Sequence, residues 1–395
     1  MIELIVNKDK DIKTIGLIEN GKLVEIYEET KESQKARNEG NIYCGVVKDI
    51  VPGMQAAFIK IGTDKNSFIH IKDVLPQVDE KKEKRKIEGK IKDILKPKQK
   101  ILVQIQKDSN DKKGARTSTH IKLTVKYVIL MPNTEIVTIS QKIANEKERE
   151  RLINIVKKQL PENTGAIIRT AAEKSEEEKI IKDLEQLEEK WEKISNDFQK
   201  SENEPKMLYK SPSIIEKIII DMPENNIDDI EVNDKKEYEE IKSLLEELKE
   251  KNIKLILKEN ENLLEKHDLD KQIEKSKQRK IWLNCGGFIT IDSTEALVAI
   301  DVNSGKFTGK TTLEETIYKV NYEATIEIAK QLRLRDIGGI IIIDYIDMQK
   351  QENKDKIERI LKETLKQDRA KTQVEGFTKL NLIEMTRKHI CSHNS

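Results

Sequence analysis

The sequence of 395 residues contains little cysteine and no long apolar run, and it has almost no net charge. Its three cysteines, Cys44, Cys285 and Cys391, are odd in number and far apart, which excludes a disulfide framework and a CxxC zinc knuckle. No segment approaches the ~18 uncharged apolar residues that a membrane span requires. The N-terminal segment also lacks an apolar signal core and a small-residue cleavage site. We therefore expect a cytoplasmic protein.

The charges of the chain are balanced, because 73 Lys and Arg residues accompany 72 Asp and Glu residues. This balance excludes a globally basic binder, so any nucleic-acid site must be a local patch. Charged residues reach 37%, yet Ile-, Leu- and Val-rich runs remain to form cores. At ~150 residues per domain, the length predicts a folded protein of two or three domains.

Residues 1–35 are predicted to form strands, and their Asn20-Gly21 dipeptide is typical of a type I′ hairpin turn. This segment is too small to fold alone, so its sheet must be completed from elsewhere in the chain. Residues 212–278 are a candidate for that role. They are predicted to contain strands at Ile214–Asp221, Asp228–Val232 and Ile253–Leu257, and a helix at Lys235–Lys251.

Residues 36–118 carry several short strand signals separated by polar turns, a pattern that favours a small β-barrel. We interpret a Lys-rich stretch at residues 81–100 as a solvated loop or helix, and a nucleic-acid contact is the less favoured alternative. Phe58 and Phe68 lie in predicted strands, and Lys113 follows the last one. Exposed aromatic side chains on such a barrel stack bases and a nearby lysine binds phosphate, although aromatic residues in strands more often belong to the core. The other aromatic residues, Trp191 and Trp282 among them, are predicted to be buried or half-buried.

Residues 119–172 again favour strands, and an amphipathic helix follows. Its apolar stripe, which we expect to dock on a neighbouring surface, consists of Ile180, Leu184, Leu187, Trp191, Ile194 and Phe198. Arg169 and Thr170 end one of the predicted strands. A guanidinium fork and a hydroxyl suit a terminal phosphate, and an ordinary salt bridge is the alternative.

Residues 281–395 alternate strands and helices, which predicts an α/β layer. A long helix is expected over Thr312–Arg335, because Thr312 and Glu315 form a capping-box pattern. The apolar run Ile340–Asp344 predicts a strand that is buried on both faces.

Two apolar strands of this region each end in an aspartate, Asp301 and Asp344. Ligands gather at the carboxyl ends of strands in open α/β sheets, and two neighbouring carboxylates suit Mg²⁺. The amide of Asn303 could orient a water molecule or a phosphate oxygen. The alternatives are simple turn formation and a nucleotide-hydrolase phosphate loop over residues 304–311, whose glycine spacing is one residue too short.

Five segments together resemble the ribonuclease E/G family. They are GFITIDSTEALVAIDVNSGKFTG, LRLRDIGGIIIIDYIDM, DRAKTQVEGFTKLNLIEMTRK, GVVKDIVPGMQAAFIKIG and GAIIRTAAE. The resemblance spans nearly the whole chain and implies an α+β multidomain fold. The implied parts are a split RNase H-like domain (residues 1–35 and 213–278), an inserted OB-fold β-barrel that binds RNA (36–118), a 5′-sensor region with the amphipathic helix (119–212) and a deoxyribonuclease I-like α/β catalytic subdomain (279–395).

The resemblance also implies roles for individual residues. Asp301 and Asp344 match the Mg²⁺ ligands of the family, and Asn303 matches its catalytic asparagine. The implied contacts with single-stranded RNA are Phe58, Phe68 and Lys113, and those with a 5′-monophosphate are Val128, Arg169 and Thr170. The implied activity is Mg²⁺-dependent endonucleolytic hydrolysis of single-stranded A/U-rich RNA in rRNA processing and mRNA decay, with a preference for 5′-monophosphorylated substrates.

One departure from the family pattern concerns assembly. The usual CPxCxG-type zinc-link and small dimerisation domain have no counterpart before Ser395. We therefore do not expect zinc-linked dimerisation, the question of a homo-oligomer stays open, and the chain is either a natural short form or a truncated one. The alternative function is a non-catalytic RNA-binding protein that has lost this module. Retention of Asp301, Asn303 and Asp344 favours the nuclease.

Overall fold

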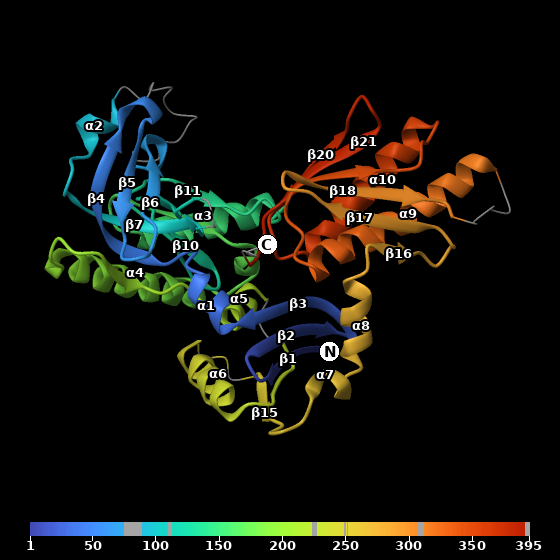
Figure 1. The fold of residues 1–395 in the computed structure, drawn as a ribbon, viewed down its shortest axis with the longest axis horizontal. Coiled ribbons are helices and arrows are strands. Elements are labelled where there is room, and N and C mark those ends of the chain that lie inside the picture. Colours follow the sequence, from blue (N-terminus) through green and yellow to red (C-terminus); the bar gives the residue numbers. More distant parts are fainter. Residues whose placement is uncertain are drawn as a thin grey trace. The chain divides into compact units, whose positions relative to one another are not determined.

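The computed structural model describes residues 1–74, 89–109, 113–222, 227–248, 250, 252–305 and 312–391 (Figure 1). The chain forms two compact units, one of residues 1–31 with 224–391 and the other of residues 32–223. The architecture is mixed α/β, and the described residues form one five-stranded, one four-stranded and two six-stranded sheets. None of the helices in these ranges is both long and apolar enough to cross a membrane.

The first unit contains the five-stranded sheet, which joins the N-terminal strands to a segment more than 200 residues later (Figure 1). In spatial order its strands are β15 (Lys254–Leu257), β14 (Asp229–Val232), β1 (Ile2–Asp9), β2 (Ile12–Glu19) and β3 (Lys22–Thr30). Helices α6 (Lys235–Leu248), α7 (Leu263–Lys266) and α8 (Leu269–Ser276) belong to the same segment. β1 pairs in parallel with β14 and antiparallel with β2. The expected completion of the N-terminal sheet by the later segment is confirmed.

The turn between β2 and β3 has the predicted geometry. Asn20 and Gly21 both adopt positive φ, at 50° and 74°, which a type I′ hairpin requires at its two central positions.

The first unit also contains a six-stranded sheet, with one face covered by helices. Its strands are, in spatial order, β16 (Lys280–Trp282), β17 (Phe288–Ser293), β18 (Leu297–Asn303), β19 (Gly339–Asp344), β21 (Leu382–Arg387) and β20 (Thr372–Phe377). Helices α9 (Leu313–Leu334) and α10 (Gln351–Thr364) and the short helix η4 (Leu365–Gln367) pack on one face and share its hydrophobic core (Figure 1). Thr312 caps α9 in a capping box with Glu315, as predicted.

The expectation that β19 is buried on both faces is wrong. Ile341 and Ile343 lie in the core under α9 and α10, whereas Ile340 on the opposite face is 51% exposed. Successive side chains of a strand point to opposite faces, and the described helices of this sheet cover only one of them. The sheet therefore presents an exposed face, which we call the open face.

The second unit contains a five-stranded closed barrel, consistent with the predicted OB-fold. Its strands are β4 (Ile42–Val51), β5 (Ala56–Lys60), β6 (Ser67–His70), β8 (Arg116–Ser118) and β7 (Lys100–Lys107), and β7 pairs with β4 to close the ring. β13 (Lys206–Tyr209) extends this sheet beside β4. Helices η1 (Pro52–Met54), η2 (Ile71–Asp73) and α2 (Ile91–Ile94) lie in its connections, and α1 (Lys31–Ala36) precedes its first strand. Residues 81–88 of the Lys-rich stretch are outside the described residues.

The remainder of the second unit is a four-stranded sheet with two long helices. The strands are β11 (Val137–Ile139), β12 (Thr164–Ile168), β10 (Val128–Pro132) and β9 (Leu123–Thr124), and the helices are α3 (Glu146–Gln159), α4 (Glu177–Lys200) and the short η3 (Thr170–Ala172). The predicted stripe of α4 docks on this sheet, with Ile180, Leu184, Leu187 and Ile194 buried and Trp191 partly buried.

The strand predicted at Ile214–Asp221 is wrong, because this segment forms helix α5 (Ile214–Asp221). Its apolar residues recur at helical spacing, and a short apolar run does not separate a strand from a helix. Ser213 and Glu216 form a capping box, which is the local signal that identifies the helix.

Candidate active site

Asp301 and Asp344 occupy matching positions on two neighbouring strands. β18 and β19 run parallel, and Asp301 and Asp344 are direct register partners at their carboxyl ends. Adjacent strands lie roughly 4.8 Å apart and register partners point to the same face. Both aspartates are exposed on the open face, so the structure brings the two predicted carboxylates together.

The electrostatics of this pair reflect their proximity. The pKa of Asp344 is raised, first by partial burial and then by the negative charges of Asp301 and Asp347. Two carboxylates in this arrangement repel each other unless a cation or a proton lies between them.

Asn303 lies two residues after Asp301 on the same face of β18, and its Nδ2 donates a hydrogen bond to Asp301 Oδ2 at 2.5 Å. This bond fixes the orientation of one carboxylate. The chain then turns at Gly305, whose φ is +60° and whose position would place a Cβ atom 2.5 Å from the Gly286 carbonyl oxygen. A glycine is therefore required where the end of β18 passes the β16–β17 turn.

The donors at this site suit a hard divalent cation. Two carboxylates and an amide oxygen are the ligand types of Mg²⁺, which usually completes its shell with water and substrate phosphate. Among the residues that the structure describes, no three or more His, Cys, Asp or Glu side chains form a ready-made metal cage. The site therefore fits an ion shared with a substrate better than a structural metal. Gly309, Lys310 and Thr311 of the phosphate-loop alternative lie outside the described residues.

The open face carries an aromatic and cationic cluster that sequence reasoning missed. Trp282 is 61% exposed, so the prediction that it is buried or half-buried is wrong. Its ring lies 5.3 Å from that of Phe288 in an edge-to-face arrangement, and Lys280 Nζ lies over both rings. The available signal was the alternation in β16, where Ile281 packs on the core and its neighbours face outward.

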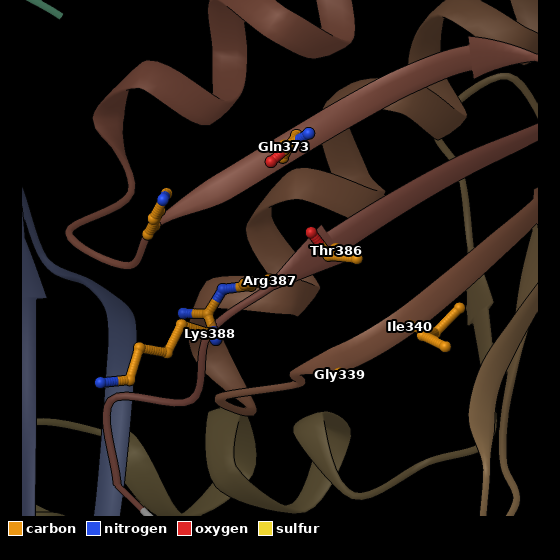
Figure 2. Close-up of a pocket in the computed structure, with 7 residues that line it drawn as sticks. Gly339, Ile340, Gln373, Thr386, Arg387 and Lys388 are labelled. Carbon is orange, nitrogen blue, oxygen red and sulfur yellow. The ribbon is translucent and has the colours of Figure 1, made fainter. Parts of the chain in front are cut away.

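A shallow cavity of about 410 Å³ lies near the other end of β19 (Figure 2). Gly339, Ile340, Lys371, Gln373, Thr386, Arg387 and Lys388 line it. Two lysines at its edge give this end of the open face a positive charge.

In the barrel, two of the predicted RNA-contact residues are in direct contact. Phe58 and Phe68 are register partners on β5 and β6, with ring centroids 6.1 Å apart in an edge-to-face arrangement. Phe58 is 37% exposed, so this pair is accessible and is not part of the barrel core. Lys113 is exposed and lies two residues before Ala115, whose carbonyl accepts a hydrogen bond from Phe68 N. Arg116, which pairs with Asp73 at 3.0 Å, is a neighbouring cation that sequence reasoning missed.

The three predicted 5′-phosphate residues cluster at one end of the β10–β12 pair. Val128 is buried opposite Ile168, and Arg169 N donates to the Tyr127 carbonyl at 2.8 Å. Thr170 is exposed, and its hydroxyl lies 2.8 Å from that of Ser140.

Arg169 is held by protein acceptors in this structure. Its Nη1 donates to the carbonyls of Val125 and Lys126 at 2.7 and 3.1 Å, and its Nη2 pairs with Asp221. The salt-bridge alternative is thus realised, and it presets the orientation of the guanidinium next to the exposed Thr170. Beneath this group, Asp183 accepts a hydrogen bond from Tyr127 N at 2.7 Å.

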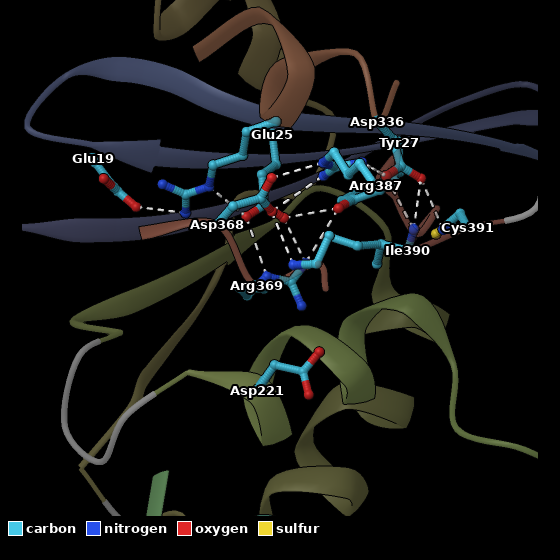
Figure 3. Close-up of polar contacts among 12 residues, drawn as sticks. Glu19, Glu25, Tyr27, Asp221, Asp336, Asp368, Arg369, Arg387, Ile390 and Cys391 are labelled. Carbon is cyan, nitrogen blue, oxygen red and sulfur yellow. Dashed lines mark hydrogen bonds and ion pairs between the residues drawn. The ribbon is translucent and has the colours of Figure 1, made fainter. Parts of the chain in front are cut away.

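Three arginines of the quoted motifs form a buried polar cluster in the first unit (Figure 3). Arg333 and Arg369 both pair with Glu25 of β3, which is completely buried. Arg387 pairs with Asp336 and Asp368, each at 2.7 Å. The two Glu25 contacts join α9 and the segment after η4 to the N-terminal sheet, and Arg387 joins the end of β21 to the segments that follow α9 and η4, so these three arginines have a structural role.

Comparison with known proteins agrees with the motifs. The model of the Ribonuclease E/G family matches residues 122–390. The chain is 38% identical to ribonuclease G of Haemophilus influenzae and 37% identical to that of Escherichia coli K12, in each case over 98% of this chain and 79% of the relative. It is 36% identical to ribonuclease E of Synechocystis sp. over 90% of this chain and 53% of that relative. The chain therefore belongs to the ribonuclease E/G family.

Proposed function

We propose that this protein is a Mg²⁺-dependent endoribonuclease that cleaves single-stranded, A/U-rich RNA in rRNA processing and mRNA decay and favours 5′-monophosphorylated substrates. The observation that carries the proposal is the register pairing of Asp301 and Asp344 at the ends of parallel strands, with Asn303 beside them. The names of its relatives, ribonucleases G and E, support the same class of reaction.

In this proposal, Asp301 and Asp344 would hold the ion through their carboxylate oxygens. When bound, the ion would offset the charge that develops on the scissile phosphate and lower the pKa of the attacking water. Asn303 holds the Asp301 carboxylate in one orientation through its 2.5 Å hydrogen bond. Its amide has a carbonyl oxygen and a second N–H besides, which can orient the water or a phosphate oxygen.

Phe58, Phe68 and Lys113 would hold the RNA on the barrel. Exposed aromatic rings stack on bases of any sequence, and a lysine contributes phosphate contact. Bases can stack on such a surface only when they are free of their own duplex, which explains a preference for single strands. Arg169 and Thr170, with Val128 beneath them, would receive a 5′-monophosphate.

The fold assignments are part of the proposal. The order of the five-stranded sheet, with three antiparallel strands continued by two parallel ones, supports an RNase H-like domain assembled from two chain segments. The six-stranded sheet with α9 and α10 on one face supports the deoxyribonuclease I-like catalytic subdomain.

The test is a cleavage assay on a 5′-monophosphorylated, fluorescently labelled single-stranded oligonucleotide. Asp301→Asn and Asp344→Asn should each lower the cleavage rate by at least about 100-fold, because each removes a charge from the proposed metal site. Asp355→Asn, an exposed carboxylate on α10 and hence on the covered side of the sheet, is the matched control and should cleave like wild type.

Two outcomes contradict the proposal. Equal cleavage by all four proteins places the chemistry elsewhere. Salt-sensitive RNA binding without cleavage at any Mg²⁺ concentration favours the non-catalytic RNA-binding protein.

A further inference from the structure

Trp282, Phe288 and Lys280 form an ordered cluster of two aromatic rings and one cation on the open face. The two rings meet at 5.3 Å with an interplanar angle of 62°. Lys280 Nζ lies 4.1 Å from the Trp282 ring centroid and 3.5 Å from that of Phe288. A cation over two aromatic rings holds them in place, so the indole is fixed although it is 61% exposed.

The sheet register connects this cluster to the candidate active site. Trp282 pairs with Phe288 and Phe288 pairs with Asn303, so these three side chains form one row across β16, β17 and β18. In the next row, Lys280 pairs with Thr290 and Thr290 pairs with Asp301. With strands roughly 4.8 Å apart, Trp282 lies about 10 Å from Asn303. This separation is on the scale of one or two nucleotides of an extended strand.

Packing does not explain the exposure of Trp282. Its neighbours Ile281 and Leu283 face the core of the sheet and are packed there, so β16 is anchored without the indole. A large exposed aromatic side chain with an adjacent ammonium group has the two elements of a single-stranded nucleic-acid subsite, a stacking surface and a phosphate contact.

We propose that Trp282, Phe288 and Lys280 form a base-stacking subsite that binds a nucleotide of single-stranded RNA one or two positions from the scissile phosphate. The inference rests on the proposed function and deepens it, because it assigns a substrate contact beside Asp301 and Asn303. A base that stacks on the indole carries its flanking phosphate within reach of the Lys280 ammonium group. The subsite therefore holds the RNA in register with the carboxylates.

The binding test uses tryptophan fluorescence, since the chain has only two tryptophans. The full chain with Trp191→Phe and Asp301→Asn keeps Trp282 as its sole tryptophan, which is excited selectively at 295 nm or above, and suppresses cleavage. Titration with a single-stranded A/U oligonucleotide should quench this fluorescence. Trp282→Leu should weaken RNA binding about tenfold, within the range for loss of one stacked base, whereas Trp282→Phe should retain most of the affinity.

Two controls make the result specific. Leu380→Ala removes another exposed apolar side chain of the same sheet region, 79% exposed, and should leave RNA affinity unchanged. The second control is a series of oligonucleotides, each with one abasic position. Wild type and Trp282→Leu should have equal affinity for the oligonucleotide that lacks the base that stacks on Trp282. The abasic position at which their affinities become equal locates the subsite relative to the cleaved bond.

The outcomes separate this inference from the proposed function. Quenching and loss of affinity in Trp282→Leu without any cleavage by wild type support the subsite and contradict the nuclease proposal. Cleavage that depends on Asp301, with unchanged KM and affinity in Trp282→Leu and no quenching, overturns the subsite alone. A fall in oligomeric mass for Trp282→Leu with unchanged RNA affinity also overturns it, because the cluster is then a protein interface.

Discussion

Asp301 and Asp344 are direct register partners on parallel strands β18 and β19, although the whole of helix α9 lies between them in the chain. The pairing places two negative charges side by side on the open face. Partial burial and the charges of Asp301 and Asp347 raise the pKa of Asp344. The folded protein therefore carries a repulsion that a bound cation or a neutral substitution removes.

The first prediction concerns thermal unfolding in the presence of Mg²⁺ alone. An ion that binds only the folded chain stabilises it, by about 2.7 kcal/mol at 100 times the dissociation constant. Mg²⁺ should therefore raise the Tm of wild type, and Asp344→Asn should lose most of that shift. Without metal at neutral pH, Asp344→Asn should unfold at the same temperature as wild type or slightly higher. A raised folded-state pKa means that the ionised carboxylate lowers stability above that pKa.

Asp355→Asn again provides the control and should show the full Mg²⁺-dependent shift of Tm. An undiminished shift in both Asp301→Asn and Asp344→Asn would show that the ion binds elsewhere in the chain.

Several features were predictable because their signals are local. Asn20-Gly21 predicted a hairpin turn, and both residues have the required positive φ. Thr312 and Glu315 predicted the start of α9, and both capping hydrogen bonds form. The meeting of Asp301 and Asp344 followed from one general rule about the carboxyl ends of strands. In each case, a few adjacent residues or a single topological rule determine the outcome.

The predictions of burial that were wrong concern surfaces whose exposure depends on which other elements pack against them. β19 reads as apolar on both faces, yet only Ile341 and Ile343 are covered, and Ile340 remains exposed. The exposure of Trp282 likewise depends on which face of β16 the helices cover. The alternation around Ile281 is the only local signal for that choice, and it extends over just three residues. The arginine pairs of Glu25 join segments about 310 and 340 residues apart, beyond the reach of any local pattern.

The second prediction concerns Glu25, which is completely buried in the polar cluster of Figure 3. It accepts hydrogen bonds from Arg333 Nε at 2.9 Å, Arg369 Nη2 at 2.5 Å and the Tyr27 hydroxyl at 2.8 Å. Glu25→Gln removes the buried carboxylate that Arg333 and Arg369 share, while Arg333 keeps its pair with Glu19. It should lower the free energy of unfolding by about 3–5 kcal/mol at neutral pH, as measured by urea denaturation.

The effect of Glu25 should also depend on pH in a defined direction. Burial raises its pKa, but the charge and hydrogen bond of Arg369, the charge of Arg333 and the hydrogen bond from Tyr27 outweigh this and lower the pKa to about 2. The stabilisation is therefore fully present above about pH 4.3, the ordinary pKa of Glu, and is lost as the pH falls toward 2.

Glu28→Gln is the matched control on the same strand. Its exposed pair with Lys277 should contribute at most about 1 kcal/mol. A similar loss from both variants would contradict the role of the buried cluster.

The third prediction concerns Asp183 of α4, whose pKa is raised where that of Glu25 is lowered, so its charged form destabilises the fold. Burial raises its pKa to about 6, against the hydrogen bond from Tyr127 N and the charges of Lys126, Arg169 and Lys190. The folded state then binds more protons than the unfolded state between about pH 4 and pH 6, so wild type loses stability as the pH rises through this window. Asp183→Asn should be more stable than wild type by about 1–3 kcal/mol at pH 8. The two proteins should be equally stable near pH 4.

Chemical denaturation at the two pH values measures this difference for Asp183. Glu185→Gln, an exposed carboxylate on the same helix, should change stability by less than about 0.5 kcal/mol at either pH. A destabilised Asp183→Asn at pH 8 would mean that the charge itself is required, for instance to balance Arg169.

The fourth prediction concerns recognition of the 5′ end of RNA by Thr170. Its exposed hydroxyl lies 2.8 Å from that of Ser140 and adjoins the fixed guanidinium of Arg169. A hydrogen bond to a charged phosphate contributes about 1.5–3 kcal/mol, which corresponds to a factor of roughly 10 to 150 in affinity. Thr170→Val should therefore reduce the ratio of cleavage rates for 5′-monophosphorylated and 5′-hydroxylated RNA by at least about tenfold, mainly through KM. The rate on 5′-hydroxylated RNA should not change, and Ser140→Ala should lower the ratio less, because it removes only the partner that orients the hydroxyl.

Arg169 is the poorer site for this test, because its removal also breaks the ion pair with Asp221. An effect on RNA recognition could then not be separated from an effect on stability. If Thr170→Val cleaves both substrates in the wild-type ratio, the 5′ end is recognised by other residues and the assignment of this cluster is wrong.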